Sequence, residues 1–102
     1  MLIVEGWIRM EPADIDRLTP AAGTMIAATL KEEGCLAYAF ARDLVDSGLL
    51  RLVERWRDEE ALAAHFQTPH MAAFNQAIAG TTRLGGSVKV YTVDAARTLI
   101  GD

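Results

Sequence analysis

The chain has 102 residues, of which 51% are hydrophobic and 24% are charged, and its formal net charge is −4 at neutral pH. These values predict one globular domain over residues 1–102. The acidic balance and the scattered basic residues argue against a nucleic-acid partner, because phosphate binding needs a basic patch. No apolar run approaches the roughly 18 residues that a spanning helix needs, so no membrane partner is expected.

The N-terminal stretch "MLIVEGWIRME" does not fit a signal peptide, because it lacks a basic n-region and carries Glu5 inside its apolar run. Cys35 is the one cysteine, which excludes an intrachain disulfide and agrees with a reducing compartment. Acidic residues precede it in "EEGCLAY", which favours an inert thiol. The expected location is the cytoplasm.

The first predicted element is a strand at 2–10, where "LIVEGWIRM" alternates and is rich in β-branched and aromatic side chains. The next segment, "PADIDRLTPAAGTMIAATLKEEG", has a helical pattern that Pro20 interrupts. A threonine followed by this proline is typical of an N-cap and the first helical residue. We therefore expect a short turn at 13–18 and the main helix at 20–33, closed by Gly34 in the C′ position.

Two strands are predicted next, at 36–43 ("LAYAFARD") and 49–57 ("LLRLVERWR"), with "LVDSG" as the turn between them. Asp58 has the position of a helix N-cap and is followed by acidic residues in the first helical turn. The "TP" pair at 68–69 repeats the sequence of a cap followed by proline. The helix is therefore expected to restart or kink there before it runs on to Ile78.

The loop "GTTRLGG" precedes a fourth predicted strand at 87–94, and residues from about 95–102 are expected to form a C-terminal arm. The resulting order, βαββαβ, is that of the α+β, ferredoxin-like fold, an antiparallel sheet with two helices on one face.

Both faces of this predicted sheet carry large apolar side chains. In the first strand, for example, Trp7 projects from one face while Val4 and Ile8 project from the other. Leaving several such side chains in water is costly, since burying one is worth roughly 1.5–3 kcal/mol. We therefore expect a homodimer in which two copies pack through their sheet faces.

The stretch "EEGCLAYAFARDLVDSGLLRLVERWRDEEALAAHFQTPHMAAF" resembles the antibiotic biosynthesis monooxygenase (ABM) family of dimeric α+β barrels. The family pattern is a glycine-centred helix end before the second strand, then E-x-W, an acidic cap, A-L-x-x-H and T-P-H-x-x-x-F. The matching residues are Gly34, Glu54, Trp56, Asp58, Ala61, Leu62, His65, Thr68, Pro69, His70 and Phe74. The pattern is specific for the family and weak for the reaction.

Two residues are the candidate catalytic pair. Glu54 projects from the same strand face as Trp56, where a partly desolvated carboxylate is expected to find a hydrogen-bond partner or to have a raised pKa. It is either a structural anchor or a pocket carboxylate that orients His65. His65 follows Leu62 by one helical turn and is either a satisfied polar residue or a proton acceptor, since imidazoles exchange protons near neutral pH.

Five residues are candidates for binding the substrate, each with a structural alternative in the core or the dimer interface: Trp56, Tyr38, Phe66, His70 and Phe74. On a continuous helix, the spacing between His65 and His70 points the two imidazoles to different faces. No further residue completes a familiar metal-ligand set. Neither a metal nor a cofactor is therefore expected.

The resemblance implies a cofactor-independent monooxygenase that oxidises a quinol, phenol or polycyclic aromatic ketone with O2. In this hypothesis His65 is the base for the substrate hydroxyl, Glu54 orients it, and the phenol of Tyr38 donates to the developing oxyanion. The alternatives are a non-catalytic dimeric module that binds a small molecule, a haem-degrading enzyme and an isomerase. The haem alternative is disfavoured, because that branch has an asparagine in its first strand and a tryptophan on its second helix, whereas Trp56 lies in a predicted strand.

Overall fold

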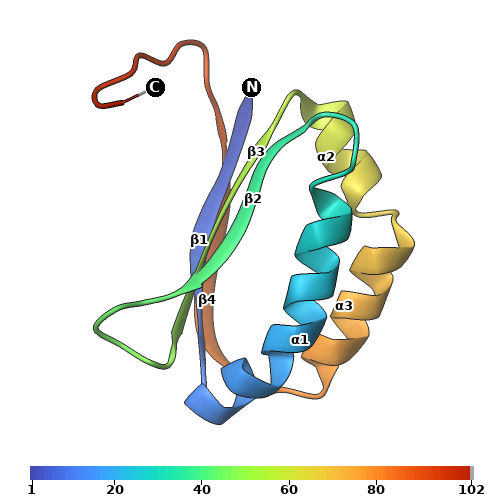
Figure 1. Ribbon diagram of the computed structural model, residues 1–102, viewed down its shortest axis with the longest axis vertical. Coiled ribbons are helices and arrows are strands. Elements are labelled where there is room, and N and C mark those ends of the chain that lie inside the picture. The colour runs from blue at the N-terminus through green and yellow to red at the C-terminus, as the bar shows by residue number, and fades with distance from the viewer. Residues whose placement is uncertain (102) are drawn as a thin grey trace.

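The computed structural model describes residues 1–101, which form one four-stranded antiparallel sheet and three helices. The elements are β1 (Leu2–Met10), α1 (Pro12–Thr29), β2 (Cys35–Arg42), β3 (Leu49–Trp56), α2 (Glu59–His65), α3 (Pro69–Ala79) and β4 (Arg83–Thr92). All of these helices lie on the same side of the sheet (Figure 1). The α+β, ferredoxin-like prediction is confirmed, with its second helix divided into α2 and α3. Within the described chain, no helix combines the length and the apolar character needed to cross a bilayer.

The strand order β2-β3-β1-β4 puts the two inner strands, β3 and β1, beneath the helices. Val4 pairs with Glu54 across these strands, and Tyr38 of β2 pairs with Glu54 from the other side. Directly paired residues project to the same face. The register therefore places Tyr38 and Glu54 side by side on the face that the helices cover.

The first helix departs from the prediction at both ends. α1 begins at Pro12, with Glu11 as its N-cap, and continues through Pro20 to Thr29. Pro20 lacks the N–H that would bond to the preceding turn, but it lies on the exposed side of the helix, where water can bond to the free carbonyl. The expected turn at 13–18 and helix start at Pro20 are therefore wrong. Gly34, with φ of +84°, lies in the turn that follows and does not close the helix directly.

The C-terminal strand begins earlier than predicted. β4 starts at Arg83, which pairs with Met10 beyond a shift in register, so most of the predicted loop "GTTRLGG" belongs to the sheet. After Thr92 the chain leaves the sheet, and residues 95–101 are exposed without helix or strand (Figure 1). The expected arm of about 95–102 also includes Asp102, which lies outside the described residues.

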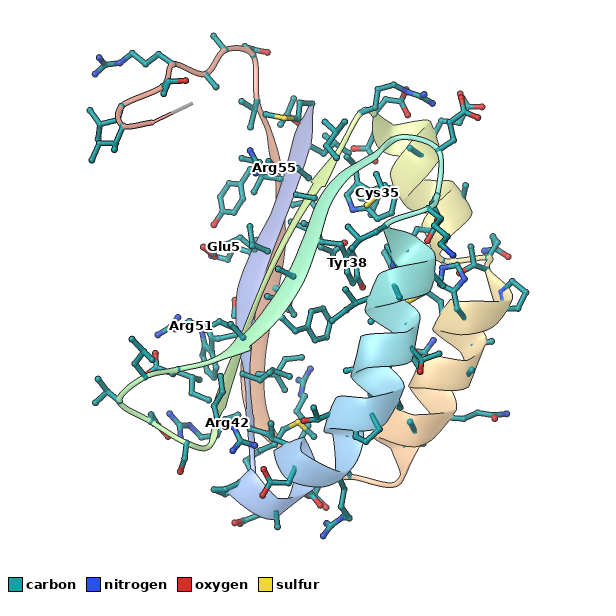
Figure 2. The ribbon with its side chains drawn as sticks, in the orientation of Figure 1. Glu5, Cys35, Tyr38, Arg42, Arg51 and Arg55 are labelled. Atoms are coloured by element: carbon teal, nitrogen blue, oxygen red, sulfur yellow. The ribbon has the colours of Figure 1, made fainter. Side chains whose placement is uncertain are left out.

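The two faces of the sheet have different surroundings. The helix-covered face holds the core, which includes Val4, Tyr38, Leu52 and Trp56. The other face is uncovered, and Figure 2 shows Glu5, Arg51 and Arg55 on that side, whereas Tyr38 and Cys35 point toward the helices. Large apolar side chains of this uncovered face remain open to solvent: Trp7 is 37% exposed, Val53 42% and Tyr91 47%.

Candidate functional site

His65 is held against the sheet by the short helix that it ends. α2 begins after Asp58, whose Oδ1 accepts the backbone N–H of Ala61 at 2.8 Å, and the buried Leu62 packs this helix into the core. The His65 ring consequently lies against Trp56, with ring centroids 4.8 Å apart. The side chain of His65 is only 1% exposed, so its protein neighbours determine where its protons lie.

The imidazoles of His65 and His70 meet at one carboxylate oxygen. His65 Nδ1 and His70 Nε2 each lie 2.7 Å from Oε2 of Glu32. The expected divergence of the two imidazoles is wrong, because the helix stops at His65 and restarts at Pro69 with Thr68 as its N-cap. This break brings the two rings to a centroid distance of 6.1 Å.

Glu32 is the site residue that the sequence reasoning missed. It lies in the turn between α1 and β2, where its N–H donates to Thr29 O at 2.9 Å and its carbonyl accepts from the N–H of Cys35 at 3.2 Å. The adjacent Glu33 has an 89% exposed side chain and pairs with Arg57. The sequence signal was the acidic pair in "EEG", which does not reveal which acid turns inward.

The hydrogen-bond network fixes the tautomer of His65. A carboxylate accepts and does not donate, so Nδ1 of His65 carries the proton that bonds to Glu32. In the neutral imidazole, Nε2 then has a lone pair that accepts from the phenol O–H of Tyr38, whose Oη lies 3.4 Å away. Burial, followed by the negative charges of Glu54 and Glu32, raises the pKa of Tyr38 well above its ordinary value. Tyr38 is therefore a neutral phenol that can donate a hydrogen bond.

Glu54 has a different partner from the one expected. Its Oε1 accepts the indole N–H of Trp56 at 2.9 Å, and burial raises the pKa of this carboxyl. The expected hydrogen-bond partner and raised pKa are thus present. The expected pairing of Glu54 with His65 is wrong, because Glu32 occupies the protonated nitrogen of that imidazole.

The candidate substrate-binding residues are divided between the core and the surface. Trp56 is fully buried, Tyr38 is 6% exposed and Phe74 is 4% exposed, whereas Phe66 is 59% exposed and so cannot wall an enclosed pocket. His70 is partly buried on Glu32. Phe40, on the same strand as Tyr38, stacks on that ring with centroids 5.6 Å apart.

Two apolar cavities meet at Phe40. The larger, of about 300 Å³, lies between α1 and the sheet, and its lining includes Ile15, Ala22, Phe40 and Arg42. The smaller, of about 80 Å³, has a lining that includes Phe40 and Phe74. Arg42 lines the larger cavity, and its guanidinium is paired with the carboxylate of Asp16 of α1 at 2.8 Å. Walls of this kind suit an apolar ligand.

Comparison with known proteins agrees with this architecture. The family model described as "Antibiotic biosynthesis monooxygenase" matches residues 1–77. The Escherichia coli protein named "Probable quinol monooxygenase YgiN" is 34% identical over 92 residues, covering 78% of this chain and 86% of that protein. An uncharacterized Synechocystis protein, sll1783, is 28% identical over 98 residues, covering 96% of this chain and 67% of its own length.

Solved structures share the fold over nearly the whole chain. Rv0793 from Mycobacterium tuberculosis is 27% identical with a TM-score of 0.81, covering 94% of this chain and 98% of that one. A protein of Deinococcus radiodurans has a TM-score of 0.88 at 23% identity, covering 99% of this chain and 100% of its own, and shows the fold alone. The match of the family model over three quarters of the chain, together with the E. coli relative, shows that this protein belongs to the antibiotic biosynthesis monooxygenase family.

Proposed function

We propose that the protein is a monooxygenase that oxidises a quinol, phenol or polycyclic aromatic ketone with O2 and without a cofactor. The observation that carries the proposal is the His65–Glu32 pair, which leaves the lone pair of Nε2 directed at Tyr38 in a buried setting. The quinol monooxygenase name of the E. coli relative points to the same chemistry.

The reaction needs little from the protein. Once an electron-rich hydroxyaromatic loses a proton, its anion can pass an electron directly to O2. One oxygen atom then enters the substrate and the other leaves as water, and the substrate supplies all the electrons, so no external reductant is required. The protein must supply a base, a donor for the developing oxyanion and an apolar chamber.

The described residues offer each of these parts. His65 takes the proton at Nε2 through the phenol of Tyr38, whose Oη lies 3.4 Å away, since His65 itself lines neither cavity. Glu32 acts as the positioning residue that holds Nδ1 protonated. The neutral phenol of Tyr38 donates to the oxyanion. Phe40 lines both cavities and stacks on Tyr38, so its ring separates a substrate in these cavities from the phenol. In this proposal a displacement of the Phe40 ring brings the substrate hydroxyl within hydrogen-bond reach of Tyr38.

The assembly belongs to the same proposal. The uncovered sheet face exposes Trp7, Val53 and Tyr91, and covering them with a second copy gives an isologous homodimer. Charged residues of that face, Glu5, Arg51 and Arg55, are placed to form a polar rim or cross-interface ion pairs (Figure 2). We expect this dimer to work in the cytoplasm, where thiols such as Cys35 stay reduced.

The test is oxygen consumption by chelator-treated protein with a panel of quinols and anthrone-type ketones. We expect uptake that survives chelation and falls by roughly 10²- to 10⁴-fold in His65→Ala, because that change removes the base. Leu44→Ala is the control, since this fully exposed side chain lies in the turn between β2 and β3 and lines neither cavity. Uptake that is unchanged in His65→Ala would refute the base assignment.

A second candidate function is supported by one observation. Trp56 and His65 are almost completely buried, and neither lines the two cavities that meet at Phe40. This arrangement also suits a module that binds a small aromatic molecule without turnover. Saturable binding of panel compounds, followed by quenching of tryptophan fluorescence, without any oxygen uptake would favour that module over the enzyme.

A further inference from the structure

We propose that Glu32, His65 and His70 form a binding site for a divalent transition-metal ion of the zinc class. The donor atoms of these three side chains all lie within 4.8 Å of one another. They come from three separate places, the turn after α1, the end of α2 and the start of α3. The inference goes beyond the proposed function, which assigns no metal to the chain.

The donor set suits this class of ion. Two imidazole nitrogens and one carboxylate oxygen are common ligands of Zn²⁺, with bonds of about 2.0–2.2 Å and a fourth position open to water. Tetrahedral geometry separates such donors by about 3.3 Å. The two nitrogens each lie 2.7 Å from the carboxylate oxygen, and all three donors lie within 4.8 Å of one another. A withdrawal of Glu32 together with an approach of the two imidazoles would place the three donors around an ion.

The charge of the cluster also favours a cation. Over residues 1–101, the ion-pair partners of Glu32 are His65 and His70, and neither lysine nor arginine is among them. The adjacent Glu33, in contrast, pairs with Arg57. A divalent ion held between these side chains would balance the carboxylate charge of Glu32.

The residues around the cluster provide an outer hydrogen-bond partner for one ligand and a solvent path to the site. Oη of Tyr38 lies 3.4 Å from the second nitrogen of His65, the place where metal-bound histidines usually find an outer partner. The side chains of His70 and Glu32 are 21% and 13% exposed, so an ion can reach the cluster from solvent past His70.

Metal binding and base catalysis would be alternative states of the same imidazole. The base needs a proton on Nδ1 of His65 and a lone pair on Nε2. When Nδ1 binds a metal, the neutral ring keeps its proton on Nε2, and the lone pair that faces Tyr38 is lost. A filled site would therefore switch off the proposed proton transfer.

Equilibrium dialysis of the chelator-stripped full chain against Zn²⁺ at neutral pH tests the site. We expect one ion per chain for wild type and for Glu33→Gln, the matched control in the same turn. Affinity should fall at least about tenfold in Glu32→Gln and in His70→Ala, each confirmed as folded by circular dichroism. Wild type that retains no zinc, or Glu32→Gln that binds zinc as tightly as wild type, would overturn the inference.

The failure of this proposal can be told apart from failure of the proposed function. Zinc is counted without any substrate, so protein that binds one ion through Glu32 and His70 keeps the metal site even if no panel compound supports oxygen uptake. Conversely, oxygen uptake by metal-free protein that retains no zinc would remove the metal site and leave the oxygenase proposal intact.

Discussion

Glu32 and Glu33 are sequence neighbours with opposite surroundings. Glu32 turns inward and accepts hydrogen bonds from two imidazoles, while Glu33 points into solvent beside Arg57. A carboxylate that fixes the tautomer of a base affects the rate of proton transfer. An exposed ion pair contributes little to stability and has no role in that proton transfer. The two residues therefore form an internal comparison for the proposed mechanism.

We predict that Glu32→Gln lowers kcat for any accepted quinol by roughly 10²-fold or more and leaves KM nearly unchanged. The amide still fills the same space but no longer enforces a proton on Nδ1 of His65. Steady-state oxygen uptake measures both constants. Glu33→Gln should match wild type, and equal losses in the two variants would contradict a positioning role for Glu32.

Glu54 predicts a pH dependence of stability. Burial raises its pKa above the unfolded value of 4.5, a negative charge on Glu32 raises it further, and the N–H of Trp56 and a charge on His65 oppose the shift. The protonated carboxyl therefore favours the folded state. The stabilisation that the protonated Glu54 carboxyl adds to the folded state is fully present below pH 4.5. It is lost as the pH rises through the higher pKa of the folded state.

Glu54→Gln should consequently become more stable relative to wild type as the pH rises toward neutrality, because the amide can accept from Trp56 without a buried charge. Urea unfolding at a series of pH values gives the difference in the free energy of unfolding. A difference that stays constant from acid to neutral pH would show that Glu54 does not titrate in this way.

At the level of elements, β1 and β4 approach each other closely where Gly6 lies. A Cβ added to Gly6 would stand 2.1 Å from the carbonyl oxygen of Ser87, a main-chain atom that cannot turn aside. In α1, by contrast, a Cβ added to Gly23 would meet nothing within 4 Å. The same substitution should therefore have opposite effects at these two positions.

We predict that Gly6→Ala lowers the free energy of unfolding by about 3 kcal/mol, since the strands must separate to admit the methyl group. Gly23→Ala should raise it by about 0.5–1 kcal/mol, because alanine restricts the unfolded chain and favours the helix. Urea denaturation of both variants provides the measurement. Similar effects at the two positions would mean that β4 is not packed against β1 as described.

The sequence predicted the strands and helices better than the helix boundaries and the turns that connect them. The period-two pattern of 2–10 and the cap-and-proline pair at Thr68 identified β1 and the start of α3, because those signals are local. The predicted helix start at Pro20 was wrong, because Pro20 lies on the solvent-facing side of α1, where water can replace the lost backbone hydrogen bond. Glu32 was missed, because its partners are distant in sequence.

At the scale of the whole molecule, the uncovered sheet face makes the clearest prediction. Val53 lies on this face and is 42% exposed. In the proposed dimer, Val53→Glu would replace an apolar contact with a carboxylate that must lose its water on association, so we expect the dissociation constant to rise at least tenfold. A tenfold rise corresponds to about 1.4 kcal/mol. Light scattering over a concentration series measures this change.

The control for that experiment is Leu44→Glu, which adds the same charge in the turn between β2 and β3, where the side chain is fully exposed. It should leave the association unchanged. If wild type is monomeric at every concentration, or if Val53→Glu associates as tightly as wild type, the second copy does not cover this face.

The sharing of Glu32 by two imidazoles has a consequence for the order of folding. The contacts join residues separated by 33 and by 38 positions, so they close long loops whose entropy cost local helix formation does not offset. A nascent chain that has formed α1 and β2 still lacks both partners of the carboxylate. The cluster therefore matures only when α2 and α3 have docked, and hydrogen exchange in the turn that holds Glu32 should slow late in refolding.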